Sequence, residues 1–157
     1  LLKEANARGI VSERLVFAQK VSHEKYLAQF QKADLYLDTF NYNAGATASN
    51  ALWAGLPVIT KLGNGYTARM AGSLLASLGL PELITTKETE YEELALKLAT
   101  NPEQLASIKQ KLAVNRSSKP LFNTELFTKH LEDGYQKAYQ RYFDGKEPEA
   151  IYVPEQV

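Results

Sequence analysis

Small residues fill a short loop at the point where a helix is predicted to begin. The loop reads Asn43-Ala44-Gly45-Ala46-Thr47 and carries no bulky side chain. Such a loop leaves the backbone N–H groups of the first helical turn accessible, and these groups together with the helix dipole attract anions. The Thr47 hydroxyl supplies one more donor. The residue types and their spacing therefore favour a site for a phosphate or a diphosphate.

The elements that must position this loop alternate between strands and helices. The hydrophobic pattern predicts, in order, strand 15–17, helix 23–33, strand 35–37, helix 47–54, strand 58–60, helix 67–78 and a short edge strand at 83–84. This alternation is typical of βαβ units, which build a parallel sheet with helices on both faces. Because ligands bind such sheets beyond the carboxyl ends of the strands, the loops beginning near Ala18, Asp38 and Lys61 are expected to meet at one crevice.

The second half of the chain is predicted to be mainly helical. Thr89-x-x-Glu92 has the pattern of a capping box, and Asn101-Pro102 and Asn123 each have the pattern of a helix start. The apolar stripe from Phe127 to Tyr142 marks one face of the last helix as core or as a surface for packing against another lobe. The predicted organisation is a partial lobe with a nucleotide-binding crevice at 1–120, a long helix at 121–149 and a loose tail at 150–157.

Composition excludes several classes of function. The chain has 18 Lys and Arg against 18 Asp and Glu, and this zero net charge argues against a nucleic-acid partner. With no cysteine and only two distant histidines, neither a metal site nor a resident cofactor is expected. No apolar run has the length needed to span a bilayer, so no membrane partner is expected. A cytoplasmic location fits this composition.

Six blocks keep their order and spacing across nearly the whole chain: Arg14–Phe17, Ala33–Thr39, Leu52–Pro57, Ala68–Ala71, Gly79–Ile84 and Pro120–Asn123. Together they resemble the O-linked N-acetylglucosamine transferases, glycosyltransferase family 41. The resemblance implies an α/β fold with a parallel Rossmann-like sheet, forming the C-terminal lobe of a GT-B type enzyme with C-terminal helices. It further implies a UDP-sugar donor and a protein acceptor with a Ser or Thr hydroxyl. That acceptor would bind through an N-terminal lobe that this sequence lacks, so the fragment alone is expected to be inactive.

The family motif itself is altered here. Family members usually carry Asn-small-His-Thr-Thr, followed three residues later by Asp. The corresponding residues place Gly45 at the His, Ala46 at the first Thr and Asn50 at the Asp, while Thr47 is retained. The resemblance implies that residues 45–47 hold the diphosphate and that Asn50 meets the ribose, unless its amide bonds a neighbouring backbone group. Because a hydrogen bond to a charged group is worth roughly 1.5–3 kcal/mol, weakened binding is expected.

Upstream, His23 and Tyr26 stand where the family often has a Lys and a His. Tyr26 is suited to stacking on a base, or alternatively to packing beside Leu27 and Phe30. His23 is suited to donating to ribose or phosphate, or alternatively to lying in solvent. The donor-binding set implied by the resemblance is Val21, His23, Tyr26, Gly45, Ala46, Thr47 and Asn50, and no catalytic residue is assigned.

Three functions remain open at this stage. The first is the UDP-sugar-binding lobe of a protein O-glycosyltransferase. The second is a degenerate homologue that binds proteins without transferring sugar, which the altered motif suggests. The third is an active transferase with a shifted donor, such as UDP-glucose, because the small Gly45 and Ala46 leave room for a repositioned donor.

Overall fold

A three-stranded parallel sheet lies at the centre of the chain. The computed structural model describes residues 1–154. Its strands are β1 (Tyr36–Leu37), β2 (Val58–Lys61) and β3 (Ile84–Thr85), in the order β1-β2-β3. Tyr36 pairs with Val58, and Thr60 pairs with Ile84. The fold is therefore α/β with a small parallel sheet, as the alternating pattern predicts.

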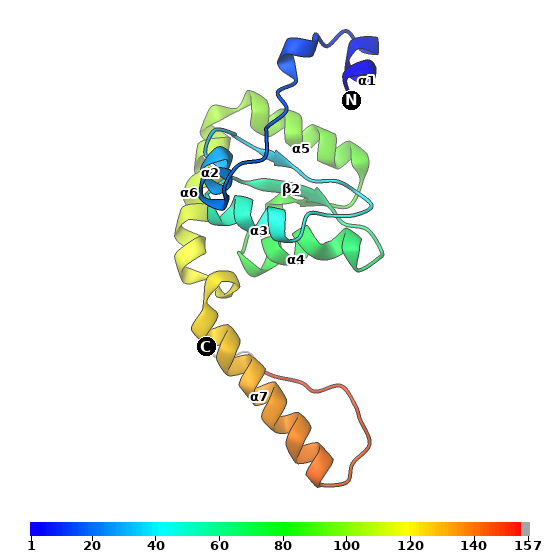
Figure 1. The fold of residues 1–157 in the computed structure, drawn as a ribbon, viewed down its shortest axis with the longest axis vertical. Helices are drawn as coiled ribbons and strands as arrows, with labels where there is room; N and C mark the ends of the chain where they lie inside the picture. Colours follow the sequence, from blue (N-terminus) through cyan, green and yellow to red (C-terminus); the bar gives the residue numbers. More distant parts are fainter. Residues whose placement is uncertain (155–157) are drawn as a thin grey trace.

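Helices cover both faces of this sheet. Helices α3 (Ala46–Trp53) and α4 (Met70–Ser77) lie on one side, and α5 (Glu88–Thr100) lies on the other (Figure 1). Helices α3 and α4 share a face because each connects one parallel strand to the next in the same direction across the sheet. Helix α6 (Pro102–Ser118) then packs against α3 and α5.

The hydrophobic core lies between β2 and the covering helices. Val58 and Ile59 are fully buried on opposite faces of β2, which is why this strand reads as a continuous apolar run. On the α6 side, the Asn115 amide is buried and donates to the carbonyl of Leu78 at 2.7 Å. It thereby satisfies a carbonyl at the carboxyl end of α4 that the helix itself leaves open. Other fully buried core residues are Ala48, Ala51, Leu52, Ala71, Leu75, Leu78, Leu80, Leu83 and Leu112.

The remaining elements lie at the two ends of the chain and in the connections. They are α1 (Leu2–Ala7), η1 (Ser12–Arg14), α2 (His23–Phe30), η2 (Thr67–Arg69), η3 (Pro81–Leu83), η4 (Pro120–Phe122) and α7 (Thr124–Phe143). Helices α1 and α7 extend away from the sheet at opposite ends of the molecule (Figure 1). Residues 155–157 of the predicted tail lie outside the described residues.

The strand predicted at Leu15–Phe17 is absent. Val16 is 88% exposed and Phe17 is 59% exposed, and the segment pairs with no strand of the described sheet. Leu15 does have extended backbone angles. An extended apolar segment becomes a buried strand only when a neighbour supplies hydrogen bonds and covers its side chains, and residues 1–154 supply neither here. The prediction of a buried strand at this place is therefore wrong.

Helix starts follow the local signals in two of four cases. The side chains of Asn101 and Asn123 accept hydrogen bonds from Gln104 N at 3.0 Å and Leu126 N at 2.9 Å, as predicted. Ser22 precedes α2, but its side chain makes no capping bond. The capping box predicted at Thr89 and Glu92 is wrong, because Glu90 instead reaches back to the backbone N–H groups of Thr86 and Lys87. The reason is that α5 begins at Glu88, which moves the first turn two residues upstream.

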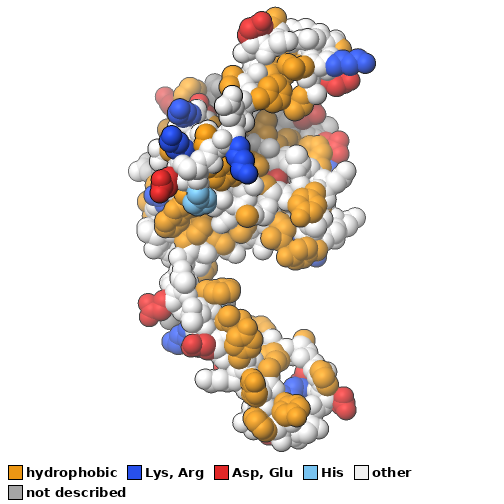
Figure 2. Space-filling view, in the orientation of Figure 1, with side chains coloured by type: hydrophobic (Ala, Val, Ile, Leu, Met, Phe, Trp, Pro, Cys, Tyr) orange, Lys and Arg blue, Asp and Glu red, His pale blue; other side chains and the backbone are white. Residues whose placement is uncertain are grey.

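The apolar stripe on α7 is exposed. Phe127, Leu131, Tyr135, Tyr139 and Tyr142 all face solvent in this chain, and Figure 2 shows apolar side chains running along this helix. The stripe therefore does not belong to the core of this chain. Packing of this face against another lobe stays a prediction.

Candidate functional site

Asp38 organises the crevice at the carboxyl ends of β1 and β2. Asp38 is 4% exposed, and its Oδ1 accepts a hydrogen bond from Ala44 N at 2.8 Å. Oδ2 accepts one from the Thr60 hydroxyl at 2.6 Å. One buried carboxylate, at the beginning of the loop after β1, is thus bonded to the end of that loop at Ala44 and to Thr60 of β2. The consequence is a fixed start for α3.

The loop after β1 is also bonded to the loop after β2. The backbone N–H of Asn43 donates to the carbonyl of Thr67 at 2.9 Å, and its side-chain amide donates to the carbonyl of Thr39 at 2.6 Å. The Asn43 side chain is almost fully buried, and its Oδ1 has no hydrogen-bond partner. The two loops therefore form one connected wall of the crevice.

The first turn of α3 opens into this wall without a cap. Gly45 precedes the helix, and no described side chain caps its N–H groups. The first N–H groups of any helix lack an acceptor within the helix, so those of residues 45–47 are available to a ligand. Ala46 is exposed, while Thr47 and Asn50 are half-buried. The alternative role for Asn50 was a hydrogen bond from its amide to a neighbouring backbone group. Among the described residues, the Asn50 amide makes no such bond.

A second group of predicted residues lines a separate hollow. Val21, His23 and Tyr26 lie around a cavity of about 560 Å³, together with the segment 18–20 and Gln29. The ring of Tyr26 also packs edge-on against Phe30, with ring centroids 4.9 Å apart. Tyr26 therefore packs against Phe30 and also lines the cavity, so the two roles considered for it are compatible.

The predicted residues thus form two groups on neighbouring helices. Residues 21, 23 and 26 lie at or just before α2, and residues 45–50 lie at the start of α3, against which α2 packs. The lining of the cavity beside Tyr26 does not include Gly45 or Thr47. Their arrangement can hold a planar group beside α2 and an anion at α3.

Sequence reasoning missed the residues that support the site. Tyr91 of α5 is buried, and its hydroxyl donates to the carbonyl of Asp38 at 3.0 Å across 53 residues. Its ring meets Phe40 edge-on at 5.0 Å. Asp38 had a signal, since it directly follows the predicted strand 35–37 and therefore lies at the crevice end of the sheet. Tyr91 had none, because its partner is distant in the sequence.

Burial, with a smaller effect from the charge of Asp38, raises the pKa of Tyr91 to about 12. An ordinary tyrosine has a pKa of 10.0, so above that pH the unfolded chain loses this proton while the folded chain keeps it. The free energy of unfolding should therefore fall between pH 10 and 12, by at most about 1.4 kcal/mol per pH unit for one proton. Denaturant titrations at several pH values should show a shallower fall for Tyr91→Phe. The exposed control Tyr139→Phe should keep the wild-type slope, and equal slopes for both variants would contradict the assignment.

No metal-binding constellation is present in the part of the chain that the structure describes. Within residues 1–154, no group of three His, Cys, Asp or Glu side chains is placed to hold an ion. Over the same residues, no helix combines the length and apolarity needed to cross a membrane. The chemistry of the site rests on backbone N–H groups, hydroxyls and an aromatic ring.

Comparison with known proteins decides the family. The sequence model of glycosyl transferase family 41 matches residues 1–131. The chain belongs to glycosyl transferase family 41. It is 33% identical over 138 residues to the UDP-N-acetylglucosamine–peptide N-acetylglucosaminyltransferase of Caenorhabditis elegans, covering 88% of this chain and 12% of that protein.

Two further relatives agree with this assignment. The probable UDP-N-acetylglucosamine–peptide N-acetylglucosaminyltransferase SEC of Arabidopsis thaliana is 33% identical over 152 residues, covering 96% of this chain and 16% of that protein. A solved mutant of the Thermobaculum terrenum O-GlcNAc transferase superposes with a TM-score of 0.80 at 32% identity, covering 87% of this chain and 26% of that one. The chain therefore spans only a small part of the length of these relatives.

Proposed function

We propose that this chain is the UDP-sugar-binding part of a family 41 protein O-glycosyltransferase. The observation that carries the proposal is the uncapped first turn of α3, held at the crevice by Asp38. The hollow beside Tyr26, on the neighbouring helix α2, adds support. Membership of family 41, several of whose members are named for UDP-N-acetylglucosamine, supports a nucleotide-sugar donor. A protein acceptor and a cytoplasmic location are part of the same proposal.

In the proposed complex, the residues divide the donor between them. Tyr26 stacks on the uracil, with Val21 and His23 beside it, and Asn50 meets the ribose. The N–H groups of residues 45–47 and the Thr47 hydroxyl hold the diphosphate. As the glycosidic bond to the sugar breaks, negative charge grows on the departing UDP, and these fixed donors stabilise it.

The same proposal gives this chain no catalytic residue of its own. Its described residues hold and orient a donor, while the acceptor and the remaining groups would come from elsewhere in a longer protein. We accordingly propose that the fragment alone does not transfer sugar. The direct test compares sugar transfer by this fragment with sugar transfer by a longer version of the protein that includes the acceptor-binding part.

A specific observation favours the degenerate, non-catalytic alternative. Neither Gly45 nor Ala46 carries a polar side chain, so only backbone groups and Thr47 remain to hold a diphosphate. The shifted-donor alternative has less support. It needs free space beside Gly45, but a Cβ added there would already be in ordinary contact with Met70 Cε, at 3.6 Å. A donor panel containing UDP-N-acetylglucosamine and UDP-glucose separates these alternatives.

Calorimetric titration of UDP tests the proposal. Thr47→Val should weaken binding by roughly 10-fold or more, because it removes a hydrogen bond to a charged group. Asn50→Ala should weaken it too, through the ribose. The control Thr89→Val, on the exposed surface of α5, should bind UDP as the wild type does.

Each outcome of the titration has a clear meaning. Weakening in both site variants with an unchanged control places the diphosphate and ribose at α3. Absence of heat at millimolar UDP, from protein with a native circular-dichroism spectrum, would favour the degenerate homologue. Tighter binding of another nucleotide-sugar would favour the shifted donor.

A further inference from the structure

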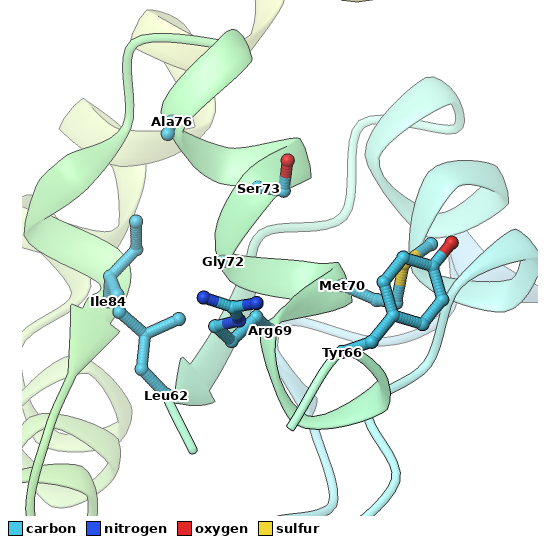
Figure 3. Close-up of a pocket in the computed structure, with 8 residues that line it drawn as sticks. All are labelled: Leu62, Tyr66, Arg69, Met70, Gly72, Ser73, Ala76 and Ile84. Carbon is cyan, nitrogen blue, oxygen red and sulfur yellow. The ribbon is translucent and has the colours of Figure 1, made fainter. Parts of the chain in front are cut away.

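A hollow of about 420 Å³ lies along α4 (Figure 3), and none of its lining residues belongs to the set assigned to the donor. Its floor consists of Leu62, Gly72 and Ile84, which come from the loop after β2, from α4 and from the edge strand β3. Tyr66, Arg69 and Ser73 bring polar groups to it. The lining of the hollow therefore combines an apolar floor with polar side chains, of which Arg69 lies beside that floor (Figure 3).

The floor depends on a glycine. Gly72 is buried, and a Cβ at this position would come within 2.3 Å of Leu62 Cδ2. Leu62 therefore lies directly on the backbone of α4. One turn further on, Ala76 adds only a methyl group to the lining. Small side chains on this face leave a depression that a larger residue would fill.

Arg69 is the charged group of the hollow. Figure 3 shows its guanidinium beside Leu62, at the middle of the lining residues. Its side chain is exposed, and no carboxylate among residues 1–154 pairs with it. Tyr66 and Ser73 are also exposed, and their hydroxyls make no hydrogen bond within the described chain. Arg69 thus presents a guanidinium beside the apolar floor without an internal acceptor, whereas the Tyr66 hydroxyl points away from Leu62 and Ile84 (Figure 3).

We propose that this hollow binds a small molecule carrying an anionic group, phosphate or carboxylate, on an apolar ring or chain. The guanidinium forms paired hydrogen bonds with either anion, and the Ser73 hydroxyl adds to them. The apolar body lies on Leu62, Gly72 and Ile84. This pairing matches the usual make-up of small-molecule sites, which place a few polar groups around an apolar surface.

The hollow is distinct from the proposed donor site but adjoins it. Met70 lines the hollow, and its Cε lies 3.6 Å from the place where a Cβ at Gly45 would stand. No residue of the implied donor-binding set lines the hollow. A ligand here is therefore an additional occupant and not the diphosphate of the donor.

Titration of the ¹⁵N-labelled chain with phenyl phosphate tests this site. We expect saturable shifts of the Gly72 and Ser73 amide signals, with a dissociation constant on the order of 1 mM. Benzoate in place of phenyl phosphate tells whether the site prefers carboxylate to phosphate. Benzyl alcohol and inorganic phosphate, which each lack one half of the ligand, should bind more weakly than phenyl phosphate.

Two variants and one control make the result decisive. Arg69→Gln should weaken phenyl phosphate binding about tenfold or more, whereas Arg14→Gln, an exposed arginine outside the hollow, should leave it unchanged. Ala76→Leu keeps the charge, fills the hollow and should abolish binding. Equal affinity for benzyl alcohol, or affinity unaffected by Arg69→Gln, would overturn the proposal. Failure of UDP to shift the amides of residues 45–47 would count against the donor site alone.

Discussion

Replacing Asp38 by alanine is expected to lower the free energy of unfolding by about 2–4 kcal/mol. The carboxylate is buried and accepts from Ala44 N at 2.8 Å and from the Thr60 hydroxyl at 2.6 Å. Its removal leaves both donors without an acceptor, and each unsatisfied buried group costs about 1–3 kcal/mol. Urea denaturation at neutral pH, followed by circular dichroism, measures this loss.

A matched control separates this effect from the loss of any surface carboxylate. Asp34 lies on the exposed surface and, among residues 1–154, pairs only with Lys109, at 2.7 Å. Asp34→Ala should therefore cost less than about 1 kcal/mol, since exposed ion pairs contribute little. If both variants lost the same stability, Asp38 would not be the organising group of the crevice.

The effect on ligand binding should follow the effect on the loop. Asp38 fixes Ala44, the residue just before the Gly45 that starts α3, so its loss frees the turn assigned to the diphosphate. UDP affinity should fall even under conditions where the Asp38→Ala variant remains folded. Unchanged affinity in the folded variant would show that the turn of α3 holds its shape without this carboxylate.

Replacing Leu52 by alanine is expected to cost about 2–5 kcal/mol. Leu52 is 0% exposed and belongs to α3, in the layer that covers β2. The substitution removes buried apolar atoms and leaves a cavity that the neighbouring helices close only in part. Denaturant midpoints, with an unchanged dependence of stability on urea, measure the loss.

Leu96→Ala supplies the comparison on the other side of the sheet. Leu96 lies on α5 and is 66% exposed, so its truncation should change stability by no more than about 0.5 kcal/mol. The two leucines are chemically identical, and only burial distinguishes them. A similar loss in both variants would argue against the core as described.

The candidate site was partly predictable because some of its features are local. The small residues around Gly45 and the start of a helix near Thr47 both follow from neighbouring positions. The grouping of Val21, His23 and Tyr26 came from the family resemblance, and the structure places all three around one cavity. Their assignment to a donor stays a proposal.

Other features were not predictable because their partners are distant in the sequence. The hydroxyl of Tyr91 reaches Asp38 across 53 residues, and the Thr60 hydroxyl reaches it across 22. The start of α5 was misplaced because the carboxylate of Glu90, and not that of Glu92, turns back to the backbone. Leu15–Phe17 has a strand-like composition but finds no neighbouring strand in the described chain.

By itself, the sequence determined the order of strands and helices from residue 23 onward, the parallel sheet and the helix starts at Asn101 and Asn123. These features depend on side-chain periodicity and on hydrogen bonds that close within three residues. Only the tertiary structure decided which apolar runs are covered and which carboxylate joins the two loops. Burial and long-range hydrogen bonds require chain segments to meet in space, and no local pattern encodes which segments will do so.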